Sequence, residues 1–80
     1  MNDARTRLVR CFSGVFPELS PSEIPKATST AIKGWDSVAT ITLLTVVEEE
    51  FGVQFEPEEL EHFVSFESIL GYLRSAKGVA

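Results

Sequence analysis

A helix-forming run in the middle of the chain limits the fold more than any other feature. The fourteen residues from Val38 to Phe51 contain no Gly or Pro, and Gly34 and Gly52 lie on either side of them. Asp36 is a residue type that caps helix N-termini, and glycine commonly follows the last helical turn. The sequence therefore predicts a helix that begins beside Asp36 and ends at Gly52.

Ser37 follows the predicted cap directly, at the exposed N-terminal mouth of this helix. Unpaired backbone N–H groups and the positive end of the helix dipole favour a bound or attached phosphate there. The position therefore suits a phosphorylated serine. Position alone, however, favours a plain capping role, because serine is common at helix N-termini.

The residues around and after Ser37 resemble the pattern of acyl carrier proteins. That family attaches phosphopantetheine to the serine of an Asp-Ser-Leu motif and closes the next helix with Glu-Glu-x-Phe-Gly. Here the corresponding residues are Asp36-Ser37-Val38 and Glu48-Glu49-Glu50-Phe51-Gly52. The resemblance covers essentially the whole chain and continues through Glu58-Glu59 and the pattern Phe66, Ile69, Leu70, Tyr72 and Leu73.

The resemblance implies that Ser37 carries phosphopantetheine covalently and that Asp36 is both a motif residue and the helix cap. It implies a phosphoprotein that is not an enzyme itself. Acyl groups would travel as thioesters on the arm, presented to partner enzymes. A phosphopantetheinyl transferase would attach the arm, and acyl ligases, synthases or acyltransferases would use it.

Several positions depart from the pattern of housekeeping fatty-acid carriers. Many of those proteins follow the serine with Leu and place acidic residues early in the next helix. This chain has Val38, Ala39 and Thr42 there, and Trp35 replaces a small or aliphatic residue. The departures favour a specialised carrier in a lipid or secondary-metabolite pathway.

Apolar spacing predicts the remaining helices. A first helix is expected from Asp3 to about Phe16, a short one over Glu58 to Phe63 with Pro57 in its first turn, and a last one after the cap Ser65. Residues 17–35 show no sustained periodicity and form a long first loop, pinned by Leu19, Ile24, Ile32 and Trp35. The predicted fold is all-α, a small four-helix bundle of three principal helices and one short helix, with residues 1–80 forming one acyl-carrier-like domain.

The periodic apolar positions also predict a core. The central helix has an apolar arc about half its circumference wide, which implies contacts with more than one neighbour. The residues expected to line the core are Ile41, Leu43, Leu44, Val47, Phe55, Leu60, Phe63, Ile69 and Leu73.

One side of the central helix is expected to face partner proteins. Val38, Thr42, Thr45 and Glu49 form a stripe opposite the apolar arc. Val38 is apolar, exposed by this pattern and next to Ser37. We therefore assign the stripe Val38, Thr42, Thr45 and Glu49 as partner-binding.

Charge is unevenly distributed along the chain. The formal net charge is −5, but residues 34–73 carry nine acidic residues and no Lys or Arg. Such a surface disfavours nucleic acid and favours basic patches on partner proteins. A solvated helix face is the plainer interpretation of the same charges.

Other features argue against further chemistry. Cys11 is the only cysteine, so no intrachain disulfide can form, and it is expected to pack in the first helix. No membrane-spanning run or secretory signal is visible, which predicts a soluble, cytoplasmic protein. We expect it to be a monomer. His62 is the only histidine, and neither it nor Glu58, Glu59 and Glu61 has metal-site spacing, so no metal is expected.

Two alternatives to an acyl carrier remain from the residues. One is a helical interaction module that keeps the fold without the modification. The other is a peptidyl or aminoacyl carrier, although that relative usually has Gly-Gly-His/Asp-Ser around its serine. The sequence Gly34-Trp35-Asp36-Ser37 favours the acyl type.

Overall fold

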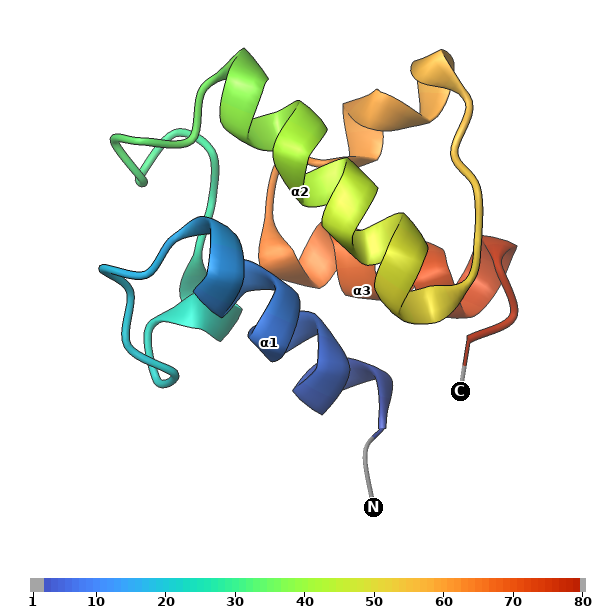
Figure 1. The fold of residues 1–80 in the computed structure, drawn as a ribbon, viewed down its shortest axis with the longest axis horizontal. Helices are drawn as coiled ribbons and strands as arrows, with labels where there is room; N and C mark the ends of the chain where they lie inside the picture. The colour runs from blue at the N-terminus through green and yellow to red at the C-terminus, as the bar shows by residue number, and fades with distance from the viewer. Residues whose placement is uncertain (1–2, 80) are drawn as a thin grey trace.

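The computed structural model describes residues 3–79 and is helical throughout its regular structure. Figure 1 shows three α-helices, α1 (Ala4–Val15), α2 (Ser37–Phe51) and α3 (Phe66–Ala76), with α1 packed against both of the others. Two short 3-10 helices lie between them, η1 (Ile24–Lys26) and η2 (Pro57–His62). The predicted small all-α bundle with three principal helices and a long first loop is confirmed.

Side-chain caps start all three α-helices. Asp3 accepts a hydrogen bond from the Thr6 N–H at 2.9 Å, and Ser65 accepts one from the Ser68 N–H at 3.0 Å. Asp36 caps α2 in the same way. The Thr6 backbone N–H also holds the pKa of the Asp3 carboxyl below its usual value. Each cap satisfies an N–H group that the helix leaves unpaired, so the predicted starts are confirmed to within one residue.

Gly52 ends α2 in the left-handed conformation, with φ 65°, as its position predicts. The segment 53–56 then crosses to η2 without forming a strand. The Glu48 carboxylate accepts a hydrogen bond from the Phe55 N–H at 2.8 Å and fixes this crossing. The predicted short helix over Glu58 to Phe63 is present, but it has 3-10 geometry and spans Pro57–His62.

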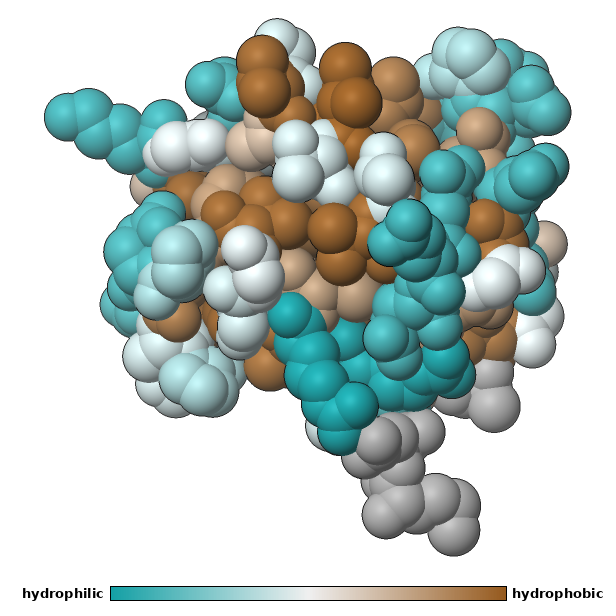
Figure 2. All heavy atoms as spheres, viewed as in Figure 1, coloured by the Kyte–Doolittle hydropathy of each residue, from teal (hydrophilic) through white to brown (hydrophobic). Residues whose placement is uncertain are grey.

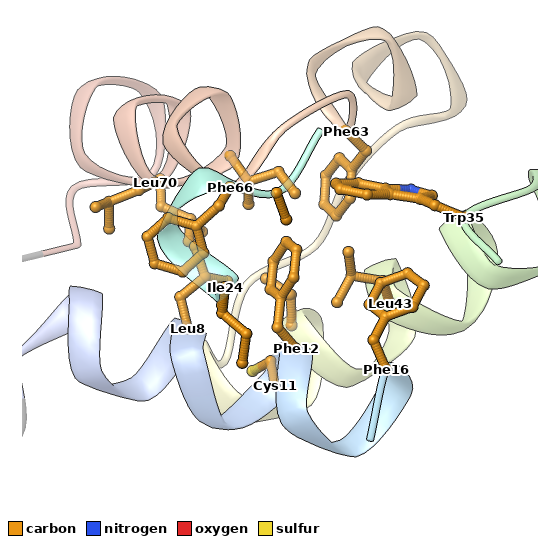
Figure 3. Close-up of a cluster of buried hydrophobic side chains, with 14 of the residues drawn as sticks. Leu8, Cys11, Phe12, Phe16, Ile24, Trp35, Leu43, Phe63, Phe66 and Leu70 are labelled. Atoms are coloured by element: carbon orange, nitrogen blue, oxygen red, sulfur yellow. The ribbon is translucent and has the colours of Figure 1, made fainter. Parts of the chain in front are cut away.

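An aromatic cluster forms the centre of the core (Figure 3). The ring of Phe12 lies 5.3 Å from that of Phe66 and 5.5 Å from that of Trp35, both in edge-on geometry. Phe16 packs beside Trp35 with its ring centroid at 5.4 Å. Aromatic pairs in this arrangement add favourable energy beyond area burial. The core therefore joins α1, α3 and the end of the first loop.

Aliphatic side chains complete this core. Cys11 is buried on α1, as expected for an unpaired cysteine. Burial raises the pKa of its thiol to about 11. The other buried aliphatic residues are Ala4, Leu8, Ile24, Ala27, Leu43, Val47, Ile69, Leu70 and Leu73.

The long first loop is held at several points. Ile24 in η1 and Trp35 at the end of the loop are buried, while Leu19 and Ile32 pack partly buried against the core. These anchors confirm the predicted pinning. The sequence did not predict η1 or the antiparallel bridge between Thr28 and Ser65, which ties the middle of the loop to the start of α3.

Ion pairs connect the acidic half of the chain to basic residues of both ends. Arg7 contacts Glu50 at 2.8 Å, and Lys77 contacts Glu59 at 3.0 Å. A third pair joins the more exposed Arg5 and Glu67 at 2.8 Å. The excess negative charge of residues 34–73 is therefore partly compensated within the fold.

Within residues 3–79, none of the helices combines the length and apolarity that crossing a membrane requires.

Candidate functional site

The turn before α2 places Ser37 at the first position of the helix. The Trp35 N–H donates to the Ile32 carbonyl at 3.1 Å, closing the turn, and Asp36 then adopts an extended conformation as the N-cap. The Asp36 carboxylate accepts a hydrogen bond from the Ala39 N–H at 2.9 Å. Ser37 is exposed. The local sequence thus presents one hydroxyl to solvent at a firmly fixed helix start.

Two backbone donors at this helix start have no protein acceptor among the described residues. The Ala39 and Thr40 N–H groups bond to Asp36, whereas those of Ser37 and Val38 make no such bond. These N–H groups and the helix dipole create a positive potential beside the Ser37 hydroxyl. This positive potential would stabilise the negative charge of a phosphate group attached to the Ser37 oxygen.

A pocket of about 360 Å³ opens beside Ser37. Trp35 and the first turns of α2 form one side, and residues of η2 and the turn after it form the other. Apolar side chains make up most of its wall. The lining residues are Ser29, Trp35, Asp36, Ser37, Thr40, Ile41, Leu60, Phe63 and Val64.

Trp35 joins the pocket to the core. Its side chain is only 5% exposed, and its ring packs against Phe12 and Phe16. Its indole Nε1–H donates to the Thr40 hydroxyl at 3.0 Å, and that hydroxyl donates to the Asp36 carbonyl at 2.9 Å. The predicted anchoring of the loop by Trp35 is confirmed. The same ring also lines the pocket.

The predicted core is wrong at Ile41. Its side chain is 58% exposed and lines the pocket instead of packing inside. Leu44, one turn further along α2, is only partly buried. Phe55 and Leu60 are likewise partly buried, and the remaining predicted core residues, Leu43, Val47, Phe63, Ile69 and Leu73, are buried as expected.

The predicted stripe on α2 faces solvent. Val38 is 71% exposed, and Thr42, Thr45 and Glu49 are exposed as well. Their placement on one side of α2 is confirmed, while their role in binding partners stays a prediction. Ala39, one turn from this stripe, is instead partly buried against the core.

The acidic residues and the histidine of η2 do not form a metal site. His62 stacks on Tyr72, with ring centroids 3.9 Å apart, and Glu59 pairs with Lys77. Lys77 holds the pKa of the Glu59 carboxyl below its usual value. Across the described part of the chain, no group of three or more His, Cys, Asp or Glu side chains is arranged to bind a metal ion.

Sequence reasoning missed three residues of the pocket. Thr40 carried no signal beyond its helix position, although its hydroxyl holds Trp35. Ser29 and Val64 meet because the Ser29 N–H donates to the Val64 carbonyl at 2.8 Å. This contact joins the first loop to the turn before α3, and local periodicity does not encode such a long-range pairing.

Comparison with known proteins bears directly on this site. The family model described as a phosphopantetheine attachment site matches residues 6–73. The match spans most of the chain, so the chain belongs to this family of carrier proteins, whose domains hold phosphopantetheine covalently and are not catalytic. Carrier domains interact with phosphopantetheinyl transferases and with other enzymes. No solved structure matches the chain.

Proposed function

We propose that this phosphopantetheine carrier is an acyl carrier protein and that Ser37 is its attachment residue. The family match supports a phosphopantetheine carrier, and we assign the attachment to the hydroxyl oxygen of Ser37. Ser37 is exposed, begins α2 and lies beside an apolar pocket. No other serine among residues 3–79 combines these three features.

Ser37 Oγ acts as the nucleophile when a phosphopantetheinyl transferase supplies coenzyme A. The oxygen attacks the pyrophosphate phosphorus nearer the pantetheine and forms a P–O bond. The bond from that phosphorus to the oxygen bridging the two phosphates breaks, and adenosine 3′,5′-bisphosphate leaves. The hydroxyl proton passes to a base of the transferase. The unpaired N–H groups of Ser37 and Val38 stabilise the resulting phosphodiester charge.

Asp36 positions the serine. Its carboxylate remains engaged with the Ala39 N–H, which keeps the first turn of α2 and the Ser37 side chain in place. Its negative charge is unfavourable beside a phosphodiester, and the helix dipole offsets this by about 0.3–1 kcal/mol. Asp36 therefore serves as a cap and motif residue. Its carboxylate only accepts hydrogen bonds, so it donates none to the phosphate of the arm.

The apolar pocket is the observation that carries the choice of acyl cargo. Ile41, Phe63 and Val64 give it an apolar wall within reach of Ser37, and Trp35 closes one side. When bound, the arm supplies a thiol that holds an acyl group as a thioester. The pocket favours an apolar acyl chain over an aminoacyl group, whose ammonium would lose hydration there.

The partners of the carrier follow from the surface. Residues 34–73 carry no Lys or Arg, so we expect a transferase and acyl ligases, synthases or acyltransferases that present basic patches. From Ser37 to Val47, α2 carries no charge, unlike the acidic start of housekeeping carriers. We therefore place this 80-residue acyl-carrier domain, acting as a monomer, in a specialised lipid or secondary-metabolite pathway.

Coenzyme A labelling tests the attachment. Incubation with coenzyme A and a broad-specificity transferase is expected to raise the intact mass by one phosphopantetheine. Ser37→Ala should abolish the increase, whereas Ser75→Ala, which changes an exposed serine of α3, should not. A wild-type protein that gains no mass would support an unmodified interaction module instead.

Cargo preference is tested by loading the arm from octanoyl coenzyme A or from glycyl coenzyme A. The octanoyl form is expected to melt higher than the unloaded form and to change the fluorescence of Trp35, the only tryptophan. The glycyl form should do neither. Equal effects of the two groups, or an effect of glycyl alone, would favour the peptidyl or aminoacyl alternative.

A further inference from the structure

The pocket beside Ser37 has an open mouth and a buried inner end. Ile41 and Val64 line the mouth and are exposed. Figure 2, viewed as Figure 1, shows brown apolar spheres gathered at the top, where the start of α2 lies near η2. Trp35 and Phe63 also line the pocket, but both side chains are almost fully buried. These two rings therefore form the inner end of the pocket, which we call the aromatic floor.

The ring of Trp35 is fixed in this floor by three contacts. The rings of Phe12 and Phe16 lie 5.5 Å and 5.4 Å from it, centroid to centroid. Its Nε1–H donates to the Thr40 hydroxyl at 3.0 Å. Turning the ring outward would leave a cavity in the core and an N–H group without its acceptor, and both are unfavourable. Trp35 is therefore a fixed boundary between the pocket and the core.

Phe63 is fixed in the floor through its ring and through the backbone that follows it. Its ring packs edge-on against Phe55, with centroids 5.2 Å apart. The carbonyl of Val64 accepts a hydrogen bond from the Ser29 N–H at 2.8 Å, which attaches the turn after η2 to the first loop. Movement of the lightly packed η2 therefore widens the pocket without deepening it.

The volume of the pocket limits the size of the group that it can hold. A cavity of roughly 150 Å³ holds one benzene ring. On that scale the pocket, at about 360 Å³, holds roughly fourteen non-hydrogen atoms. The thioester and the last atoms of the arm occupy part of this space. The remainder accommodates an acyl chain of about eight carbons.

We propose that Trp35 and Phe63 select the cargo by chain length, because the aromatic floor stops an acyl chain after about eight carbons. This inference rests on the proposed function, since it assumes that Ser37 carries an acyl group. A chain up to this length is buried from its thioester to its end. The end of a longer chain lies outside the pocket, where its exposed apolar surface is unfavourable. The carrier therefore favours short and medium acyl groups over long ones.

Acyl groups of increasing length test the depth of the pocket. The full wild-type chain is labelled by a broad-specificity transferase with even-numbered acyl coenzyme A from butyryl to hexadecanoyl, and the intact mass verifies each product. The melting temperature should rise up to octanoyl, because each buried methylene adds stability, and then level off. Retention on a hydrophobic-interaction column should stay close to that of the unloaded carrier up to octanoyl. It should increase for longer chains, whose ends are exposed.

Two substitutions test whether the aromatic floor sets this limiting length. Phe63→Leu and Trp35→Leu each replace a ring of the floor by a smaller apolar side chain. The space gained corresponds to roughly three to six non-hydrogen atoms, so the limiting length should move from octanoyl to decanoyl or dodecanoyl. Phe66→Leu is the matched control, because it removes a ring that is buried in the same cluster but does not line the pocket. It should lower the melting temperature of every form and leave the limiting length at octanoyl.

A wild-type melting temperature that rises up to hexadecanoyl without added column retention would overturn the proposal, because the chain would then pass the aromatic floor. A melting temperature that no acyl group changes would also overturn it. The same holds if a folded floor variant keeps the wild-type limiting length, or if Phe66→Leu moves it equally. Should Trp35→Leu not fold, Phe63→Leu decides this point. Wild-type protein that gains no phosphopantetheine would instead contradict the proposed function.

Discussion

The two sides of the pocket beside Ser37 are built differently. One side is the start of α2 with Trp35, whose ring is locked against Phe12 and Phe16 and bonded to Thr40. The other side begins with η2, in which none of the six residues is fully buried. The α2 side of the pocket is therefore rigid and fixes Ser37. The η2 side is held by fewer contacts, so the pocket can adapt to the group carried on Ser37.

The η2 side of the pocket is held by contacts of Phe63 and Glu59. Phe63, directly after η2, is buried and packs edge-on against Phe55, with ring centroids 5.2 Å apart. Lys77 near the C-terminal end reaches Glu59 at 3.0 Å and also lies over the Phe55 ring at 5.2 Å. These contacts hold η2 by a few side chains. Local opening of η2 should therefore cost less free energy than opening of the aromatic core.

The largest expected difference between the two regions is in stability. Phe12→Ala removes the central ring of the aromatic cluster and should cost about 3–5 kcal/mol, most of the stability of a domain this small. Leu60→Ala, in the half-buried η2 wall, should cost about 1 kcal/mol. Denaturant unfolding of both variants measures the difference. Equal costs would show that η2 is as tightly packed as the core.

Thiol labelling compares the mobility of the two regions directly. The raised pKa of about 11 leaves the buried Cys11 thiol almost wholly protonated at neutral pH, so it should react only after unfolding. A cysteine placed in η2, as Leu60→Cys in a Cys11→Ala background, should react at least about 100-fold faster through local opening. Similar rates at the two sites would contradict the proposed mobility of η2.

A smaller effect is expected from the hydrogen bond within the rigid wall. Thr40→Val keeps the side-chain shape but leaves the Trp35 Nε1–H without its acceptor, which should cost about 1–3 kcal/mol. Thr45→Val, whose hydroxyl bonds only its own helix, is the matched control and should cost less than about 1 kcal/mol. Thermal melts of the two variants and the tryptophan emission of Thr40→Val give the readout. An unchanged melting temperature and tryptophan emission in Thr40→Val would show that the Thr40 hydroxyl does not support the site.

The smallest effect concerns pH and the attachment of η2. Because the folded pKa of Glu59 is lowered by Lys77, its ion pair contributes stability above the ordinary carboxyl pKa of about 4.5. That contribution is lost as pH falls through the lower folded value. Wild type should therefore be more stable than Glu59→Gln at pH 7, and the difference should shrink as the pH falls below the ordinary carboxyl pKa.

Glu61→Gln, at an exposed position of η2, is the control for this pH dependence and should track wild type throughout. Hydrogen exchange of the η2 amides should report the same change locally. A gap between wild type and Glu59→Gln that persists at low pH would assign the effect to packing and not to the charge of Glu59.

The sequence predicted the parts of the fold that local patterns encode. Asp3, Asp36 and Ser65 identified the helix starts, and Gly52 the end of α2, because caps depend on neighbouring residues. Ile41 was wrongly assigned to the core because helical periodicity gives a direction and not the distance to the next element. The Ser29–Val64 contact depends on long-range pairing, which no local pattern contains. The sequence analysis also missed η1, although its hydrogen bonds are local.

The candidate site likewise has one half that the sequence predicted and one half that it did not. Its polar half, Asp36 and Ser37, follows from local cap chemistry and from the motif. Its apolar half brings Trp35 together with Leu60 and Val64, which are distant in sequence. The hydrogen bonds of the Thr42 and Thr45 hydroxyls were not predicted either, because the sequence records the threonines and not the helix carbonyls that accept from them.

The most direct test of the account is to locate the arm on the labelled protein by fragmentation mass spectrometry. Wild-type chain labelled by a phosphopantetheinyl transferase should carry one phosphopantetheine, on the fragment ions that contain Ser37 and on no others. This result would support a carrier whose reactive oxygen lies at the rigid start of α2. An arm found on Ser29, Ser65 or any other residue, or no arm at all, would contradict it.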